Sequence, residues 1–217
     1  MKTLQINCNN QPFILHPSGA AFWEEKGILL IADVHLGKIM HFRKHGSAVP
    51  QSSMYQNFDR LNKVVDYFET KIVCFLGDLF HSHINTEWLL FQDWIYNLNC
   101  KVVLVSGNHD IIATEFYNKL NVTVIQEWKI DDFLLTHHPE ERKGYYNFSG
   151  HIHPGVQLRG LGKQRLKLSC FYKREHQMIF PAFGNFTGNY IVKPTTNESV
   201  FVTTKDEVLE IPIDRES

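Results

Sequence analysis

Short apolar runs alternate with longer segments of helical spacing through the first half of the chain. Continuous apolar runs at 27–32, 71–76 and 101–105 are typical of buried strands. Residues 53–69 and 86–99 instead carry apolar side chains every three or four positions, which places them on one face of a helix. Strands that alternate with helices in this way indicate crossover units and a largely parallel core sheet.

The pattern differs at both ends of the chain, where short strands dominate. Thr86 is the expected N-cap of the second helix, and a short third helix is expected at 113–120. Strand-like segments are found at 4–7, 13–16, 20–23, 122–126, 133–136, 146–149, 166–172, 177–180, 199–203 and 207–211. We therefore predict an α/β fold, an α/β/β/α sandwich of two mixed sheets with helices outside. The absence of repeats and linker-like tracts favours one domain over residues 1–217.

Composition narrows the possible partners and the compartment. The net charge of -1 gives no overall field that would attract nucleic acid or an anionic membrane, so an anionic substrate would need local positive charge. The four cysteines form no CxxC pair, which is typical of buried, reduced thiols. No signal-like or membrane-spanning apolar stretch is visible, and we expect a cytoplasmic protein that does not engage a membrane.

Histidine is concentrated in a few places. The chain has 12 histidines, and most of them lie in tight groups that follow apolar runs. Imidazole is the commonest metal ligand in proteins and titrates near neutral pH. Such grouping suggests chemistry, although each histidine pair alone is more often an ordinary surface feature.

Five apolar runs end in residues that could bind a metal. In chain order these residues are Asp33 and His35; Asp78; Asn108, His109 and Asp110; His137 and His138; and His151 and His153. Ligands of open α/β sheets bind at the carboxyl ends of the strands, so these side chains are expected to converge. One such strand end would be weak evidence, but five in succession point to a single site.

The ligand types indicate two divalent cations. Two carboxylates, one amide oxygen and four imidazoles suit Mn²⁺ best, with Fe or Zn as alternatives, and suit Ca²⁺ or Mg²⁺ less well. A bridging carboxylate would hold two ions about 3.5–4 Å apart, as in two-metal phosphoryl chemistry. Gly77, Gly107 and Gly150 are expected to let the backbone turn sharply beside these ligands.

The blocks DVH (33–35), GD (77–78), GNHD (107–110), HHP (137–139) and GHIH (150–153) resemble the signature of the calcineurin-like metallophosphoesterase superfamily. The resemblance implies that Asp33, His35, Asp78 and His153 hold one metal, and that Asp78, Asn108, His137 and His151 hold the other. It further implies that a metal-bridging hydroxide attacks phosphorus, that His109 acts as general acid, and that Asp110 orients His109. His138 would lie outside the ligand set.

A narrower resemblance covers nearly the whole chain. The stretches ADVHLGKIMHFRKHGSAVP (32–50), FSGHIHPGVQLRG (148–160) and PAFGNFTG (181–188) are similar to the bacterial DNA-ligase-associated metallophosphoesterases. Those proteins are encoded beside an ATP-dependent DNA ligase and a helicase and are regarded as DNA-repair endonucleases or phosphodiesterases. The resemblance implies a phosphate-ester substrate such as DNA, and association with a ligase and a helicase.

Two basic segments are candidates for substrate binding. Arg43 lies in a basic segment at 38–45 that contains one phenylalanine, and Arg159 begins a second basic cluster at 159–167. Basic residues interleaved with aromatic ones suit a nucleic-acid strand, but a solvated loop or strand face explains both segments equally well. The phenylalanines Phe148, Phe183 and Phe186 could stack on a base, although core packing is the commoner role.

Two other functions remain open at this stage. The chain could be a small-molecule phosphohydrolase that acts on a nucleotide, a cyclic nucleotide or a UDP-sugar-lipid diester. It could also be a non-catalytic subunit of a ligase–helicase complex. The complete ligand set together with His109 argues against the latter.

Overall fold

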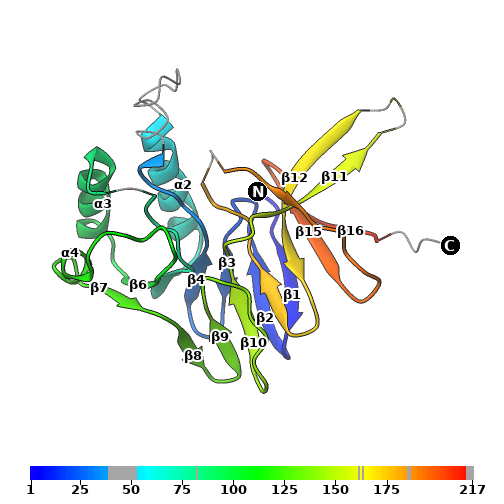
Figure 1. Ribbon diagram of the computed structural model, residues 1–217, viewed down its shortest axis with the longest axis horizontal. Coiled ribbons are helices and arrows are strands. Elements are labelled where there is room, and N and C mark those ends of the chain that lie inside the picture. The colour runs from blue at the N-terminus through cyan, green and yellow to red at the C-terminus, as the bar shows by residue number, and fades with distance from the viewer. Residues whose placement is uncertain (39–52, 82, 161, 163, 185–186, 214–217) are drawn as a thin grey trace.

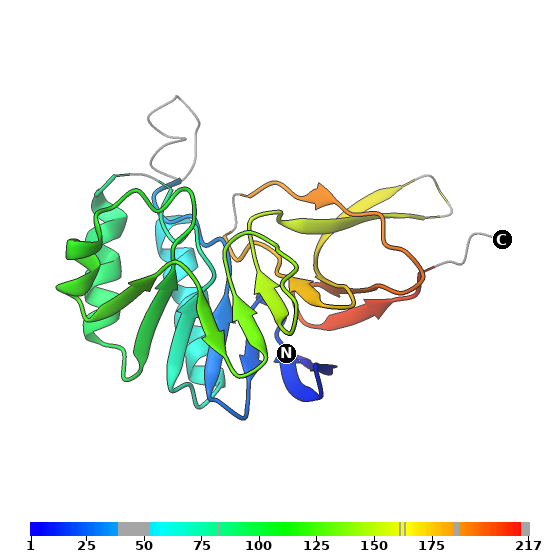
Figure 2. The ribbon, with the colours of Figure 1, turned by 60° about the horizontal axis from the view of Figure 1, so that its bottom comes forward.

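The computed structural model contains two mixed sheets with helices on one side (Figures 1 and 2). It describes residues 1–38, 53–81, 83–160, 162, 164–184 and 187–213. The predicted pair of mixed sheets with helices outside is confirmed. None of the helices among these residues is long and apolar enough to cross a membrane.

The first sheet has seven strands in chain order. They are β1 (Leu4–Cys8), β2 (Gln11–Leu15), β3 (Ala21–Trp23), β4 (Ile28–Ile31), β5 (Ile72–Phe75), β6 (Lys101–Val105) and β7 (Val122–Ile125). The strands from β1 to β4 pair antiparallel through short turns, whereas β4 to β7 pair parallel. Strands β4 to β7 can pair parallel because crossover segments that contain the helices connect them.

The second sheet is formed by the strand-rich remainder of the chain. It contains β8 (Trp128–Ile130), β9 (Phe133–Leu135), β10 (Tyr146–Ser149), β11 (Pro154–Arg159), β12 (Arg165–Lys173), β13 (Gln177–Ile179), β14 (Tyr190–Ile191), β15 (Ser199–Thr203) and β16 (Val208–Ile211). Strands β9, β10 and β13 run parallel to one another. The hairpin of β11 and β12 projects from the body of the molecule at the end away from the helices (Figures 1 and 2).

Three helices confirm the helical spacing in the sequence. They are α2 (Ser53–Tyr67), α3 (Thr86–Tyr96) and α4 (Thr114–Asn118). The N-cap of α3 is Asn85 rather than the expected Thr86, because the Asn85 side chain accepts the hydrogen bond from the Glu87 N–H. All three described helices belong to one apolar cluster on the outer face of the seven-stranded sheet.

The core has one layer on each side of the seven-stranded sheet. Alternate residues of β5 divide between them: Val73 and Phe75 face the helices, whereas Cys74 and Leu76 just beyond β5 face the second sheet. Phe148 of β10 is fully buried in the layer between the sheets. Each such side chain contributes about 1.5–3 kcal/mol on burial, which holds the two sheets at a fixed separation. That packing positions the strand ends described below.

Candidate metal centre

The ends of β4, β5, β6, β9 and β10 bring their polar side chains together. Three groups of side chains have ligand atoms within 4.8 Å of one another, and they share members. The groups are Asp33, His35 and His153; Asp33, Asp78 and His137; and His137, His138 and His151. The convergence that the sequence predicts is therefore present in the structure, although the residues come from segments more than a hundred positions apart.

The first position lies between Asp33, His35 and His153. The two Nε2 atoms of His35 and His153 are 3.2 Å apart. The Nε2 atom of His153 is also 3.3 Å from Oδ1 of Asp33, and Oδ2 of Asp78 lies 4.0 Å from the Nε2 atom of His35. Four ligand atoms thus surround a common point, with a spacing that suits a divalent cation at about 2.0–2.2 Å from each.

The second position is centred on His137. Its Nε2 atom lies 3.1 Å from Oδ1 of Asn108, 3.2 Å from Nδ1 of His151 and 3.4 Å from Oδ1 of Asp78. Asp78 therefore directs one carboxylate oxygen to each position, Oδ2 to the first and Oδ1 to the second. This is the geometry that a bridging carboxylate needs.

Backbone groups orient several of these ligands. The Nδ1 atom of His137 lies 2.9 Å from the Leu76 carbonyl, so Nδ1 carries the proton and Nε2 presents its lone pair to the site. The N–H of His151 donates to Oδ2 of Asp33, and the N–H of His109 donates to Oδ1 of Asp78. These bonds leave the remaining lone pairs directed at the two positions.

The donor set fits two cations. Oδ1 of Asp33 is buried and has no hydrogen-bond partner among the described residues. An isolated buried carboxylate oxygen is costly unless a cation satisfies it. Burial, aided by the charge of Lys38 and by neighbouring imidazoles, lowers the pKa of His35 to about 2, and burial also lowers the pKa of His151. Both imidazoles are therefore neutral and able to bind a metal at physiological pH.

The backbone is strained at the ligands. Five residues of the predicted ligand set have left-handed φ angles between 50° and 69°: Asp33, His35, Asp78, His151 and His153. This conformation is unfavourable for residues with a Cβ atom, by about 1–2 kcal/mol each. Packing of the two sheets imposes this cost at the site where the side chains must converge.

At Gly107 and Gly150 a glycine is needed because another residue's side chain lies too close for a Cβ atom, and not because the backbone turns sharply. Gly77 has a φ of 87°, as a sharp turn requires, but Gly107 and Gly150 have no such angle. A Cβ atom at Gly107 would collide with Oδ1 of Asp78, and one at Gly150 would collide with Oδ2 of Asp33. The expectation that all three provide turns is therefore corrected for Gly107 and Gly150.

His109 and Asp110 follow β6 at the mouth of the site. The His109 side chain is 45% exposed, and its Nε2 atom lies 4.0 Å from Oδ2 of Asp78. The Asp110 carboxylate accepts hydrogen bonds from the N–H groups of Phe80 and Gly107. It therefore supports the loop that carries His109, and no bond from it to the His109 ring is found among the described residues.

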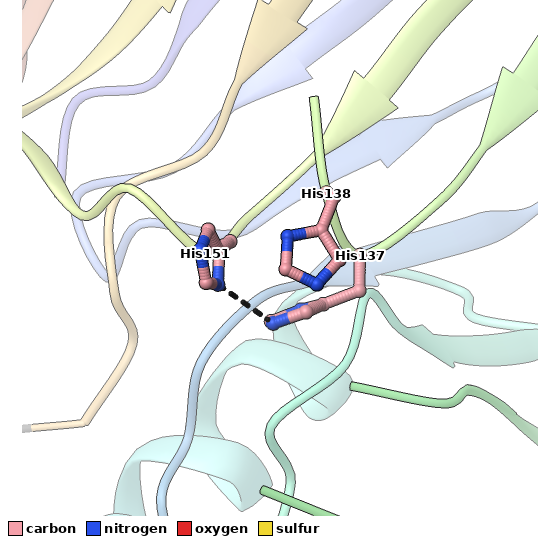
Figure 3. Close-up of side chains that lie close together, drawn as sticks. All are labelled: His137, His138 and His151. Carbon is pink, nitrogen blue, oxygen red and sulfur yellow. Dashed lines mark hydrogen bonds between the residues drawn. The ribbon is translucent and has the colours of Figure 1, made fainter. Parts of the chain in front are cut away.

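Two further histidines lie closer to the site than the sequence suggests. Figure 3 shows His138 beside His137 and His151, and the centroids of the His138 and His151 rings are 4.1 Å apart. The His81 ring lies 4.5 Å from the His109 ring and 5.3 Å from the His35 ring. In the sequence both histidines lie close to predicted metal ligands. They were not assigned as ligands because the predicted set was already complete without them.

The expected substrate residues lie apart from the ligands or outside the described residues. Arg159 is exposed at the end of β11 on the projecting hairpin, directly opposite Arg165 of β12. Arg43 and Phe186 lie outside the described residues. Phe148 and Phe183 are fully buried, so the possibility that they stack on a base is wrong and the core role is correct.

Comparison with known families agrees with this geometry. A family model described as calcineurin-like phosphoesterase matches residues 27–179, which contain all of the convergent side chains. The chain belongs to this family. It is thus a metallophosphoesterase, and its clustered histidines and aspartates lie where a dinuclear metal centre of the family is held.

Solved structures extend the comparison beyond the family model. A Pseudomonas putida nuclease, MPE, is 29% identical to this phosphoesterase with a TM-score of 0.83, and the match covers 97% of this chain and 100% of the nuclease. A protein of unknown function, AQ665 from Aquifex aeolicus, is 16% identical with a TM-score of 0.43, covering 58% of this chain and 78% of its own. No curated protein matches the chain.

Proposed function

We propose that this phosphoesterase is a phosphodiesterase that cleaves nucleic acid in DNA repair. The observation that carries the proposal is the double position around Asp78, in which the two oxygens of one carboxylate face two sets of imidazoles. Similarity to a nuclease along nearly the whole chain supports nucleic acid as the substrate. Action on DNA inside the cell would place the protein in the cytoplasm.

We assign one set of ligands to each of the two positions. Asp33, His35, Asp78 and His153 hold one cation, and Asp78, Asn108, His137 and His151 hold the other. The mixture of oxygen and imidazole ligands favours Mn²⁺, with Fe or Zn as alternatives. When bound, such a pair of ions polarises the phosphoryl oxygens and activates water for in-line attack.

His109 would supply the proton to the leaving group. Its exposure at the mouth of the site lets it reach a phosphodiester bound above Asp78. The His109 N–H bond to Oδ1 of Asp78 ties the position of this side chain to the bridging carboxylate. Asp110 would act as a positioning residue, because its carboxylate fixes the loop between Gly107 and Asp110.

Basic residues on the projecting hairpin would bind the nucleic-acid backbone. Arg159 and Arg165 are paired directly across β11 and β12, and Lys167 lies two residues further along the same face of β12. Like charges directly opposite one another destabilise a sheet, and a phosphate chain would relieve that repulsion. We include Arg43 in this role on the basis of the sequence, and we keep a ligase and a helicase as proposed partners.

The test is turnover of three substrate classes by the purified protein with Mn²⁺. We expect hydrolysis of bis(p-nitrophenyl) phosphate and of single-stranded DNA, and loss of both in Asp78→Ala. Asp93→Ala, an exposed aspartate on α3, is the matched control and should retain activity. Turnover of nucleotides or cyclic nucleotides without cleavage of DNA would favour a small-molecule phosphohydrolase. A protein that binds metal and turns over none of these would be a non-catalytic subunit instead.

A further inference from the structure

A cavity of about 560 Å³ lies beside the metal centre and has no part in the chemistry described above. Several separate segments line it: Met1, the β2–β3 turn, helix α2, Ser169 of β12, the end of β15 with the turn that follows, and the residues Ala182, Gly184, Thr187 and Asn189. Its charged lining residues are Arg60, Lys63, Lys205 and Asp206, so cations exceed carboxylates. A volume in this range accommodates a ligand the size of a nucleotide.

One wall of the cavity is bonded to a predicted metal ligand. Gly184 lines the cavity, and its N–H donates to the carbonyl of Asp33 over 3.1 Å. The adjacent Phe183 N–H donates to the carbonyl of Ala32. The segment between the cavity and the metal centre is therefore only one backbone layer thick, so the two are close neighbours.

Arg60 holds that wall in place and adds a fixed positive charge. Its guanidinium donates to the carbonyls of Phe183 and Ser18 over 2.7 and 2.9 Å and lies 4.5 Å from the centre of the Phe183 ring. Lys63 is one turn further along α2 and is exposed, and Lys205 is exposed on the β15–β16 turn. The two lysines are thus free to move toward a ligand, whereas Arg60 is anchored.

The cavity also continues into the basic face of the projecting hairpin. Ser169 lines the cavity and belongs to β12. Side chains alternate along a strand, so Arg165, Lys167 and Ser169 share one face. The hydroxyl of Thr203, another lining residue, donates to the Ser169 carbonyl and joins the hairpin to the β15–β16 turn. Basic side chains therefore lie along this face between Ser169 at the cavity and Arg159.

We propose that this cavity is a nucleotide subsite, which binds the nucleotide next to the scissile phosphodiester through a non-scissile phosphate paired with Lys63 and Lys205. The inference rests on the proposed function, because it names how a nucleic-acid strand is held at that site. Phosphate groups bound by lysine release counterions, and this makes the affinity depend on salt.

The test compares the wild-type protein with Lys63→Ala/Lys205→Ala, using Lys101→Ala as the matched control. Lys101 is also exposed but begins β6, at the opposite end of the strand from the ligands. Binding of fluorescein-labelled dT6 is measured by anisotropy at several salt concentrations. For the double variant we expect about tenfold weaker binding and a salt dependence with a slope lower by about 0.7 for each lysine removed. The ratio of kcat/KM for dT6 to that for bis(p-nitrophenyl) phosphate should fall in parallel.

Binding and cleavage are measured separately so that the two proposals can fail separately. A wild-type protein that binds dT6 through the lysines but does not cleave it would overturn the nuclease function and support the subsite. Equal salt slopes for wild type and double variant would overturn the subsite, whether or not DNA is cleaved. Competition by inorganic phosphate as strong as that by dT6 would also overturn it, because a free anion site would then suffice.

Discussion

The Nε2 atoms of His35 and His153 lie 3.2 Å apart across a sequence separation of 118 residues. Burial keeps His35 neutral, so two basic nitrogen atoms face one another with Oδ1 of Asp33 beside them. A cation bound to these three atoms would stabilise the arrangement more than a hydrogen bond between the two rings does. The site should therefore be less stable without metal than with it.

The first prediction concerns metal removal. Mn²⁺ at about 100 times its dissociation constant should raise the free energy of unfolding by about 2.7 kcal/mol relative to the protein in EDTA. For a chain of this size that corresponds to a rise in Tm of about 5–10 °C in a calorimetric scan. The His35→Ala/His153→Ala variant should lose most of the response. Identical Tm values in Mn²⁺ and EDTA for the wild type would contradict the metal centre.

The second prediction concerns Gly150, whose substitution should weaken metal binding without replacing any predicted ligand. In Gly150→Ala the new methyl group collides with Oδ2 of Asp33 and lies 2.8 Å from the Cβ atom of Ala32, so Asp33 must move. Displacement of a ligand by its surroundings typically costs about 10–100-fold in metal affinity. Titration calorimetry with Mn²⁺ measures this directly. Gly188→Ala is the control, because a Cβ atom there meets no atom within 4 Å, and affinity should be retained. Equal affinities for the two variants would argue against the close approach.

The sequence predicted which side chains converge better than it predicted how the backbone supports them. Asp33, Asp78 and His151 could be identified because each follows an apolar run, and parallel strands end at a common edge. The role of Gly150 could not be predicted, since it depends on how closely β10 approaches the end of β4. The bonds that Asp110 accepts from Phe80 and Gly107 depend likewise on tertiary packing.

The cavity beside the metal centre was not visible in the sequence. Its lining comes from several separate segments, and no one segment carries a motif for phosphate binding. Lys63 and Lys205 are single exposed lysines in the sequence, and only the packing of α2 beside the β15–β16 turn brings them to one cavity. The prediction of a basic track from Arg159 identified the hairpin but not the cavity to which it leads.

The third prediction tests backbone strain. His153 has a φ of 53°, a conformation that glycine adopts without penalty. In EDTA, His153→Gly should be more stable than His153→Ala by about 1 kcal/mol, measured by urea unfolding. Asn108, which is also a predicted ligand, has no left-handed φ angle. The order should therefore reverse there, with Asn108→Ala more stable than Asn108→Gly. The same order at both positions would show that strain at His153 is not significant.

The fourth prediction separates His109 from the metal ligands. A general acid matters most when the leaving group is a poor one, and its loss typically costs about 10²–10⁴-fold. His109→Ala should therefore lose DNA cleavage by about that factor but lose much less activity on bis(p-nitrophenyl) phosphate, whose leaving group needs no proton. Mn²⁺ affinity should be unchanged. His176→Ala, an exposed histidine, is the control. Equal losses on both substrates would assign His109 another role.

The fifth prediction concerns pH and His16. Burial, reinforced by nearby positive charge that includes Arg60, lowers the pKa of His16 to about 4 from 6.5. Between these values the unfolded chain binds a proton that the folded protein does not, so stability is complete above pH 6.5 and falls as the pH drops toward 4. The full difference in the free energy of unfolding is about 3 kcal/mol at most, and solvent in the adjacent cavity screens part of it.

In His16→Asn the amide oxygen can still accept a hydrogen bond from the Ser18 N–H, as Nδ1 of His16 does now. Thermal unfolding between pH 7 and 4 should therefore show a flatter pH dependence for this variant. Equal slopes would mean that folding does not lower the pKa of His16.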